Sequence, residues 1–299
     1  MTTTINQVGR MGILCLVALN LLVGVTPAAS NEPTFTPIDF PGAISTTPTM
    51  INTGGETVGD YTSADGHSHG FLLSQNDFTS IDVPGATATL ARGINPEGAI
   101  VGRYQTADGS FHGFLLSKGS FITIDFPDAT STIANGINPQ GEIVGMYFDG
   151  DGVGHGYLLT KGGFTSLDFP GAIFTWAQGI NPQGEVVGWY TDADGKSHGF
   201  LLSGGIFTSI DFPGAVTTFV HQGINPRGDF VGRYIAPDGN SHGYLQSRGT
   251  FTSLDVPGAI LTGAVGINPA GEIVGFYCDN PACASLPGPV RGFLLSRKP

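Results

Sequence analysis

The sequence predicts an all-β protein: a six-bladed β-propeller with four antiparallel strands in each blade of about 43 residues. Glycine accounts for 47 of the 299 residues and proline for another 20, which is too much turn chemistry for long helices. The 40% share of hydrophobic residues excludes a disordered chain. A phrase of the type Phe-Thr-Ser-Ile-Asp recurs at intervals of 43 or 44 residues, which is the length of a propeller blade. The six repeats begin at Phe35, Phe78, Phe121, Phe164, Phe207 and Phe251.

Each repeat contains the same elements in the same order. The Phe-Thr-Ser-Ile-Asp run is followed by a Pro-Gly-Ala loop, Gly-Ile-Asn-Pro-x-Gly, Val-Val-Gly-x-Tyr, an Asp-Gly turn and His-Gly-Phe-Leu-Leu-Ser. The apolar runs have the length of strands and end at turn residues. Asn138-Pro139-Gln140-Gly141 has the residue preferences of a type I turn, and two-residue loops such as Lys118-Gly119 are typical of hairpins. Four strands joined as a meander are therefore expected in every repeat.

The two ends of the repeat array predict how the propeller closes. The array begins with the fourth strand of a blade and finishes with the third strand of one. We therefore expect Phe35–Phe40 to pair with Gly292–Ser296, so that both ends complete the last blade. Such closure removes an exposed sheet edge.

Residues 1–30 have the three-part pattern of a secretory signal peptide, and residues 31–299 form the propeller domain. Arg10 precedes the apolar run Met11–Val25, and small residues follow at Ala28–Ser30. The run is shorter than a membrane span requires, so a cleaved leader is favoured over a membrane anchor or a buried N-terminal helix. We expect a secreted protein, extracellular or periplasmic, that keeps no stable membrane span after cleavage.

Two cysteines of the exported part, Cys278 and Cys283, lie close together in the sequence. In an oxidising compartment this spacing predicts a disulfide across a loop. A structural zinc site would need four ligands, and the domain has no other cysteine. Twelve basic against 24 acidic residues argue against a nucleic-acid partner, because contacts to phosphates require clustered Lys and Arg.

The repeats resemble a known family. Gly179–Gly188, followed by Ser197–Leu202, is similar to the HAF-family extracellular repeat of exported bacterial proteins, with His-Gly-Phe in place of His-Ala-Phe. The similarity covers Phe35–Ser296. The resemblance implies export and a propeller-like repeat, and it implies no particular activity.

A histidine in the third strand and an aspartate in the fourth strand recur 13 residues apart, and antiparallel pairing places them side by side. A catalytic dyad or a ring of metal ligands is one interpretation. We favour a structural contact, because the pair occurs in almost every repeat whereas an enzyme needs one asymmetric site. In the last repeat Arg291 replaces the histidine, and closure would place it opposite Asp39. The structural set is His69, His112, His155, His198, His242 and Arg291 with Asp39, Asp82, Asp125, Asp168, Asp211 and Asp255.

The Asp-Gly turns are weak candidates for calcium sites. Asp149 with Asp151, and Asp192 with Asp194, have the Asp-x-Asp-Gly pattern of a calcium loop but lack its distant bidentate acid. Plain hairpin turns are the favoured interpretation. Calcium is accordingly the one cofactor considered, and no other is indicated.

A ligand site is expected where the repeats differ. One residue before the Gly of Gly-Ile-Asn, on the strand expected to line the channel, the repeats carry residues of different size and polarity. Four candidate ligand-binding residues occupy this position: Arg92, Asn135, Gln178 and Gln222. Two further candidates are Trp189, at a second variable position between the Gly and Tyr of the following strand, and His221, the one histidine outside both the repeated pattern and the Asp-Gly turns.

The sequence favours a non-catalytic binding or scaffold module with a glycan or protein ligand, and a monomer. One alternative is a hydrolase or lyase with a single site at the channel mouth, using Arg92 and His221. Another is a calcium-stabilised envelope protein. The chain lacks the nucleophile elbow, phosphate loop and zinc-protease motifs of common enzymes.

Overall fold

The computed structural model describes residues 1–2, 34–281 and 288–296. The chain divides into two units, residues 1–31 and 32–299, and the fold described here is that of the second. No α-helix occurs between residues 34 and 281 or between 288 and 296, where all regular elements are strands. In the same residues no helix is long and apolar enough to cross a membrane.

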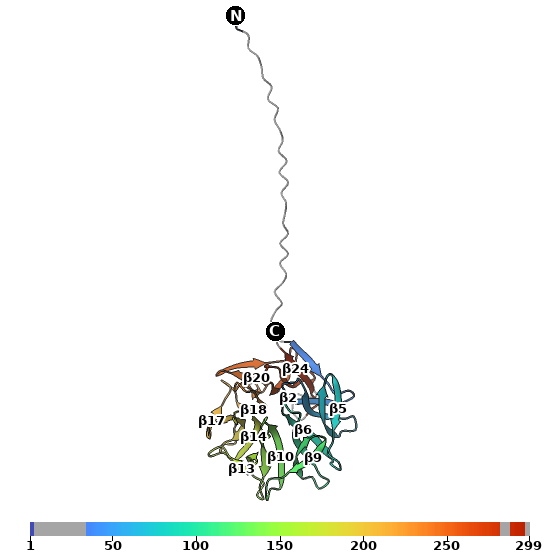
Figure 1. Ribbon diagram of the computed structural model, residues 1–299. Helices are drawn as coiled ribbons and strands as arrows, with labels where there is room; N and C mark the ends of the chain where they lie inside the picture. Colours follow the sequence, from blue (N-terminus) through green and yellow to red (C-terminus); the bar gives the residue numbers. More distant parts are fainter. Residues whose placement is uncertain (3–33, 282–287, 297–299) are drawn as a thin grey trace. The chain divides into compact units, whose positions relative to one another are not determined.

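The strands form a ring of sheets around a central axis (Figure 1). The innermost strands are β2 (Ser45–Ile51), β6 (Ala88–Ile94), β10 (Ser131–Ile137), β14 (Phe174–Ile180), β18 (Thr217–Ile224) and β22 (Leu261–Ile267). The second strands are β3 (Thr57–Thr62), β7 (Ile100–Gln105), β11 (Ile143–Phe148), β15 (Val186–Thr191), β19 (Phe230–Ile235) and β23 (Ile273–Cys278). The third strands are β4 (Ser68–Ser74), β8 (Phe111–Ser117), β12 (Gly154–Thr160), β16 (Ser197–Ser203), β20 (Ser241–Ser247) and β24 (Arg291–Ser296). The outermost strands are β1 (Thr34–Ile38), β5 (Asp77–Ile81), β9 (Ser120–Ile124), β13 (Gly163–Leu167), β17 (Ile206–Ile210) and β21 (Thr250–Leu254).

The sheets are antiparallel meanders, as the order of strand and turn signals predicts. Four sheets have four strands each, and a fifth has eight strands. The two halves of the fifth sheet are joined by a single parallel bridge between Ser241 and Leu261. Sheets arranged radially around a channel make this fold a β-propeller.

The predicted pairing of the two ends is confirmed. β1 runs antiparallel to β24, with Thr34 opposite Ser296 and Ile38 opposite Gly292, and Figure 1 shows the blue first strand beside β24. The first strand stops at Ile38, before the expected end at Phe40. Beyond it the Phe40 N–H donates to Thr46 Oγ1 at 3.0 Å, and the chain turns toward β2.

The core lies between neighbouring sheets. One cluster combines Val58 of one repeat with Ala91, Ile100 and Phe114 of the next, all buried. Gly102 of the Val-Gly-x-Tyr motif is required by this packing, because a Cβ atom there would lie 2.7 Å from the Phe114 ring. The repeated glycines thus let the aromatic third strand approach the second strand closely.

Asparagine side chains connect neighbouring repeats at one end of the channel. Asn138 Oδ1 accepts N–H bonds from Gln140 and Glu142 of its own turn, while its Nδ2 reaches the Asn181 carbonyl of the next repeat at 3.4 Å. The same kind of bond joins the last repeat to the first, because Asn268 Nδ2 donates to Asn52 O at 3.4 Å. The Gly-Ile-Asn-Pro motif therefore both caps its turn and connects neighbouring repeats.

Candidate functional site

The channel carries a ring of side chains that β-bulges turn inward. In every innermost strand the pairing with the second strand shifts register beside the residue that precedes the Gly of Gly-Ile-Asn. In β2 the residue at the place of this Gly is Met50. A bulge inserts a residue that the ladder does not pair, and so re-aims its side chain. The residues at these bulges are Thr49, Arg92, Asn135, Gln178, His221 with Gln222, and Val265.

These side chains meet in one cavity of about 220 Å³. All six predicted ligand-binding residues line it. Six further polar or aromatic residues of the same wall were not among the predicted candidates. The lining consists of Thr47, Thr49, Arg92, Asn135, Trp176, Gln178, Trp189, Phe219, His221, Gln222, Arg233, Val265 and Phe276.

Three of these residues lie opposite the variable position between the Gly and Tyr of the second strand. Thr47 and Phe219 lie opposite Asp60 and Arg233 across the first hairpin of their repeats. Trp176 lies opposite Trp189 in the same way. The sequence signal was therefore the variable position between Gly and Tyr in the second strand, read together with its cross-strand partner.

Several buried polar atoms of the cavity have no hydrogen-bond partner in the described part of the chain. They are Trp176 Nε1, Gln178 Oε1, His221 Nε2, Gln222 Oε1 and Arg233 Nε. Gln178 and Gln222 are only 4% and 7% exposed. Buried polar groups are normally paired, and each unpaired one costs roughly 1–3 kcal/mol. Donors and acceptors without partners therefore gather around a single space.

Two other ring residues are used by the fold itself. Thr49 Oγ1 donates toward the Val58 and Ala91 carbonyls at 3.1 Å each, and Asn135 Nδ2 donates to Ala177 O at 3.0 Å. These bonds tie an innermost strand to the strand of the next repeat. The amide of Asn135 is therefore partly structural, in contrast to Gln178 and Gln222.

An aromatic cluster forms one side of the cavity. Trp189 stacks on Phe174 at 5.0 Å, and Phe219 meets it edge-on at 5.2 Å. Trp176 lies 5.5 Å from Trp189 at an angle of 45°. One face of Trp189 is thus already covered, so the cluster offers an apolar wall with one indole N–H rather than an open stacking platform.

Arginines make the cavity electropositive. Arg92 Nη1 lies 3.4 Å from Asp60 Oδ1, and this carboxyl is largely buried. Burial raises the pKa of Asp60 although Arg92 and Arg103 oppose the rise. Burial lowers the pKa of Arg103 to about 10, with repulsion from Arg92 adding to the effect. One buried carboxylate therefore faces two guanidinium groups.

Arg233 differs from Arg92 in having no carboxylate beside it. Its Nη1 donates to Ser241 Oγ at 3.3 Å, and its guanidinium lies 4.8 Å from the centre of the Phe219 ring. Burial alone lowers its pKa. Among the ion pairs of residues 34–281 and 288–296, none involves Arg233.

His221 is poorly suited to acid–base catalysis. Burial, followed by repulsion from Arg233 and Arg92, lowers the pKa of His221 to about 3. A general base works best with a pKa near the working pH, and such a histidine is a weak base at pH 7. The lowered pKa therefore argues against His221 as the general base of the predicted hydrolase or lyase alternative.

A second cavity of about 250 Å³ lies at the Asn-Pro end of the channel. Its wall is formed by isoleucines such as Ile94 and Ile180 and by prolines such as Pro139. The asparagines of this wall are bonded within their turns and to neighbouring repeats. This second cavity is therefore mainly apolar and has fewer available hydrogen-bonding groups than the cavity of about 220 Å³.

The five repeated third-strand His side chains each contact the Asp that follows 13 residues later, as predicted. The His Nδ1 to Asp Oδ1 distances are between 2.7 and 3.1 Å. At the seam Arg291 takes the histidine's place, and its Nε and Nη2 donate to Asp39 Oδ2 at 3.2 and 2.7 Å. A tyrosine of the second strand stacks on each histidine; Tyr147 on His155, at 5.1 Å, is one case. None of these His or Asp residues lines the cavity of about 220 Å³.

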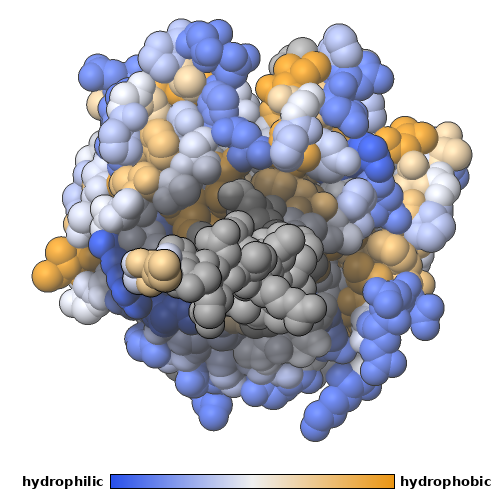
Figure 2. Space-filling model, turned by 90° about the horizontal axis from the view of Figure 1, so that it is seen from above, coloured by the Kyte–Doolittle hydropathy of each residue, from blue (hydrophilic) through white to orange (hydrophobic). Residues whose placement is uncertain are grey.

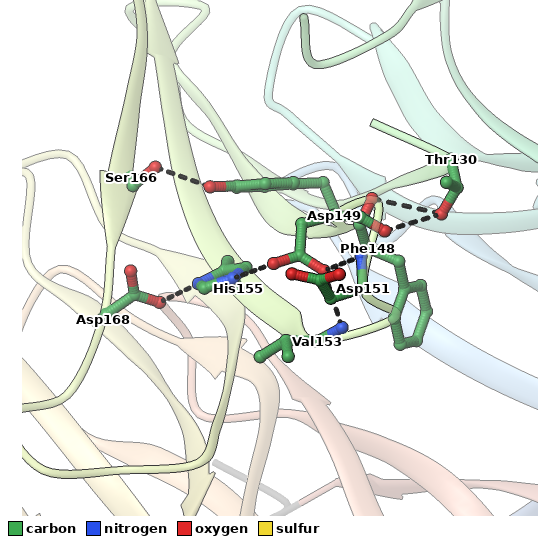
Figure 3. A network of polar contacts seen from close by, with 9 residues as sticks. Thr130, Phe148, Asp149, Asp151, Val153, His155, Ser166 and Asp168 are labelled. Atoms are coloured by element: carbon green, nitrogen blue, oxygen red, sulfur yellow. Dashed lines mark hydrogen bonds and ion pairs between the residues drawn. The ribbon is translucent and has the colours of Figure 1, made fainter. Parts of the chain in front are cut away.

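Two of the four predicted calcium candidates, Asp149 and Asp192, cap their own turns. Asp149 Oδ1 accepts the N–H groups of Asp151 and Val153 at 2.9 and 2.8 Å, and Oδ2 lies 3.3 Å from His155 Nε2 (Figure 3). Asp192 caps the turn containing Asp194 in the same manner. In the described ranges no group of three or more His, Cys, Asp or Glu side chains is arranged to hold a metal ion. The hairpin-turn interpretation accounts for Asp149, Asp151, Asp192 and Asp194.

Of the predicted disulfide pair, Cys278 is buried at the end of β23. Cys283 lies outside the described residues. The disulfide therefore stays a prediction.

No protein-family profile and no curated protein sequence matches the chain. Solved structures do share its fold. AofleA from Arthrobotrys oligospora superposes with a TM-score of 0.56 at 11% identity, covering 89% of this chain and 88% of its own. TolB from Acinetobacter baumannii has a TM-score of 0.56 at 15% identity, covering 85% of this chain and 64% of its own. A fucose-specific lectin from Aleuria aurantia has a TM-score of 0.50 at 13% identity, covering 78% and 88%.

Proposed function

We propose that this chain is a non-catalytic binding module whose channel cavity holds a small polar ligand, such as the end of a glycan. The observation that carries the proposal is the gathering, around one space of about 220 Å³, of five buried polar atoms that have no partner among the described residues. A ligand with hydroxyl groups satisfies such donors and acceptors, and the aromatic wall of Trp176 and Trp189 packs against its apolar face. The similarity to a fucose-specific lectin concerns the fold alone. The proposal of a glycan ligand therefore rests on the chemistry of the cavity.

We infer six blades for the propeller. The eight-stranded sheet is interpreted as two four-stranded blades, because only the bridge between Ser241 and Leu261 joins its halves. With the four separate sheets this interpretation agrees with the six repeats in the sequence. The asymmetric cavity then sits on the axis of a nearly symmetric ring.

Export, a monomeric state and membership of the HAF repeat family complete the proposal. The leader pattern of residues 1–30 and the expected pair Cys278 and Cys283 support an oxidising compartment outside the cytoplasm. The closed pairing of β1 with β24 supports a monomer, because it removes a sheet edge that would otherwise recruit another chain.

The test is a thermal-unfolding measurement of the chain from Asn31 to Pro299 against a panel of mono- and disaccharides, followed by titration calorimetry. We expect the melting temperature to rise with one sugar class, because a ligand that binds only the folded state stabilises it. The variant Gln178→Met removes the unpartnered amide and keeps the side-chain length. It should bind at least tenfold more weakly, yet its unfolding free energy without ligand should be about 1 kcal/mol higher, since a buried unpaired polar group is removed.

Gln246→Met is the matched control, because Gln246 is partly buried in β20 and does not line the cavity. It should leave affinity unchanged. Equal affinity in Gln178→Met and the parent protein, or the absence of any sugar-dependent shift, would refute the proposed site.

A further inference from the structure

We propose that the ligand of the channel cavity is an acidic sugar of monosaccharide size, with its carboxylate bound by Arg233. This inference rests on the proposed function and narrows it to one ligand class. It follows from three features of the described residues: an unpaired buried cation, a matched set of uncharged polar groups, and the size of the space.

The cation comes first. Two other arginines of the described chain have a carboxylate partner: Arg92 faces Asp60, and Arg291 faces Asp39. Arg233 has only the Ser241 hydroxyl and the face of Phe219, while its Nε has no partner among the described residues. A buried charge without a counter-ion is unfavourable, and an anion arriving there offsets that cost.

The geometry around Arg233 suits a carboxylate. Its guanidinium carbon lies over the Phe219 ring, and its Nη1 donates to Ser241 Oγ, so the fork of donors is oriented before any ligand arrives. Bidentate guanidinium–carboxylate pairs are among the strongest hydrogen-bonded contacts. The same positive field acts on His221, whose pKa is depressed by Arg233 and Arg92 in addition to burial. The protein as a whole carries a net charge of −12, so this positive interior is a local feature.

The uncharged groups call for hydroxyls. Gln178 Oε1 and Gln222 Oε1 are acceptors without donors, and Trp176 Nε1 is a donor without an acceptor, within the described part of the molecule. A sugar hydroxyl both donates and accepts, so a ring bearing several of them serves all three. An inorganic anion would satisfy Arg233 and leave the two amide oxygens unpaired.

The size of the cavity is the third feature. Pockets for drug-sized molecules begin at roughly 300 Å³. A space of about 220 Å³ suits one sugar ring. A longer acidic glycan would therefore enter with its terminal residue only.

The experiment compares acidic sugars with their neutral parents by titration calorimetry on the chain from Asn31 to Pro299. The probes are glucuronate against glucose, galacturonate against galactose, and N-acetylneuraminate against N-acetylmannosamine. We expect at least one acid to bind tenfold or more tightly than its neutral partner, and we expect 0.5 M NaCl to reduce that preference.

Arg233→Met keeps the aliphatic stem over Phe219 and removes the charge. It should abolish the preference for the acid. Arg103→Met is the matched control, because Arg103 occupies the same position in its repeat and lies 4.8 Å from the Phe111 ring, but does not line the cavity. It should retain the preference.

The outcomes separate the two proposals. Neutral sugars binding as well as acids, or Arg233→Met keeping the preference, would overturn the acidic-sugar inference and leave the binding module standing. No binding of any sugar would overturn both. Loss of the preference in Arg103→Met as well as in Arg233→Met would mean that the effect is not specific to Arg233, and would also overturn the inference.

Discussion

His221 shows how one residue changes the channel. The repeat that contains it is 44 residues long rather than 43, and the extra length falls in β18, where the ladder resumes at Ile224 only after skipping three residues past Val220. His221 and Gln222 therefore share a bulge that holds one residue in the other repeats. The interval in the sequence was the visible sign of this insertion, although the sequence did not say where the insertion lay.

The contact between Arg291 and Asp39 leads to a prediction about a single residue. Its guanidinium donates twice to Asp39 and lies 3.6 Å from Asp279, and both Arg291 and Asp39 are exposed to solvent by more than a third. Arg291→Ala should lower the unfolding free energy by only about 0.5 kcal/mol, because solvent screens such pairs. Urea denaturation measures the difference, and sugar binding should not change.

Arg291→His provides the control for that prediction. It recreates the His and Asp pair found in the other repeats, and it should recover most of the lost stability. A stability of Arg291→Ala equal to that of the parent would mean that the seam contact contributes nothing.

At the scale of the element, the hairpins explain why the aspartates of the Asp-Gly turns recur. Each carboxylate accepts backbone N–H groups of its own turn, and these bonds lower the pKa of Asp149 and Asp192. Asp65 is lowered mainly by Ser63, and Asp108 mainly by Thr106, through side-chain hydrogen bonds. The same local chemistry thus serves several turns with different partners.

This capping predicts a pH dependence. A carboxylate whose folded pKa lies below its ordinary value of 3.8 stabilises the fold above pH 3.8, and that contribution is lost as the pH falls through the folded pKa. The double variant Asp149→Asn/Asp192→Asn keeps an acceptor in each turn but cannot titrate. Its urea midpoint should therefore fall less between pH 5 and pH 2.5 than that of the parent.

Asp151→Asn/Asp194→Asn is the comparison for the pH experiment, because these residues lie in the same turns and their carboxylates do not cap them. Its midpoint should fall as much as the parent's. An identical pH response in both double variants would contradict the capping assignment.

At the scale of the propeller domain, closure depends on the first strand. β1 pairs with β24, Asp39 meets Arg291, and Phe40 stacks on Tyr61 at 3.6 Å. The surface seen in Figure 2 shows hydrophobic residues in small separate patches among hydrophilic ones.

A chain that begins at Pro41 should consequently melt at a temperature several degrees lower and associate as its concentration rises, because the edge of β24 is left unpaired. Light scattering and thermal unfolding measure both effects, and a synthetic peptide of residues 31–42 should reverse them. A chain that begins at Thr34 keeps β1 and serves as the control. If the shortened chain stayed monomeric with an unchanged melting temperature, the closure model would be wrong.

The sequence alone determined the strands, the turns and the pairing of the two ends. Those features depend on local residue preferences repeated every 43 or 44 residues, such as Lys118-Gly119, where both residues have positive φ as a tight hairpin requires. The repeat of His112 and Asp125 likewise predicted their contact, because register follows from loop length.

Only the tertiary structure decided how the differing positions combine. Gln178, His221 and Arg233 come from two repeats, and their placement around one cavity depends on bulges and on the packing of neighbouring sheets. The field that lowers the pKa of His221 arises from groups distant in sequence, Arg92 among them. Burial and electrostatic potential depend on all groups that surround a residue in the fold. A local sequence pattern therefore cannot predict them.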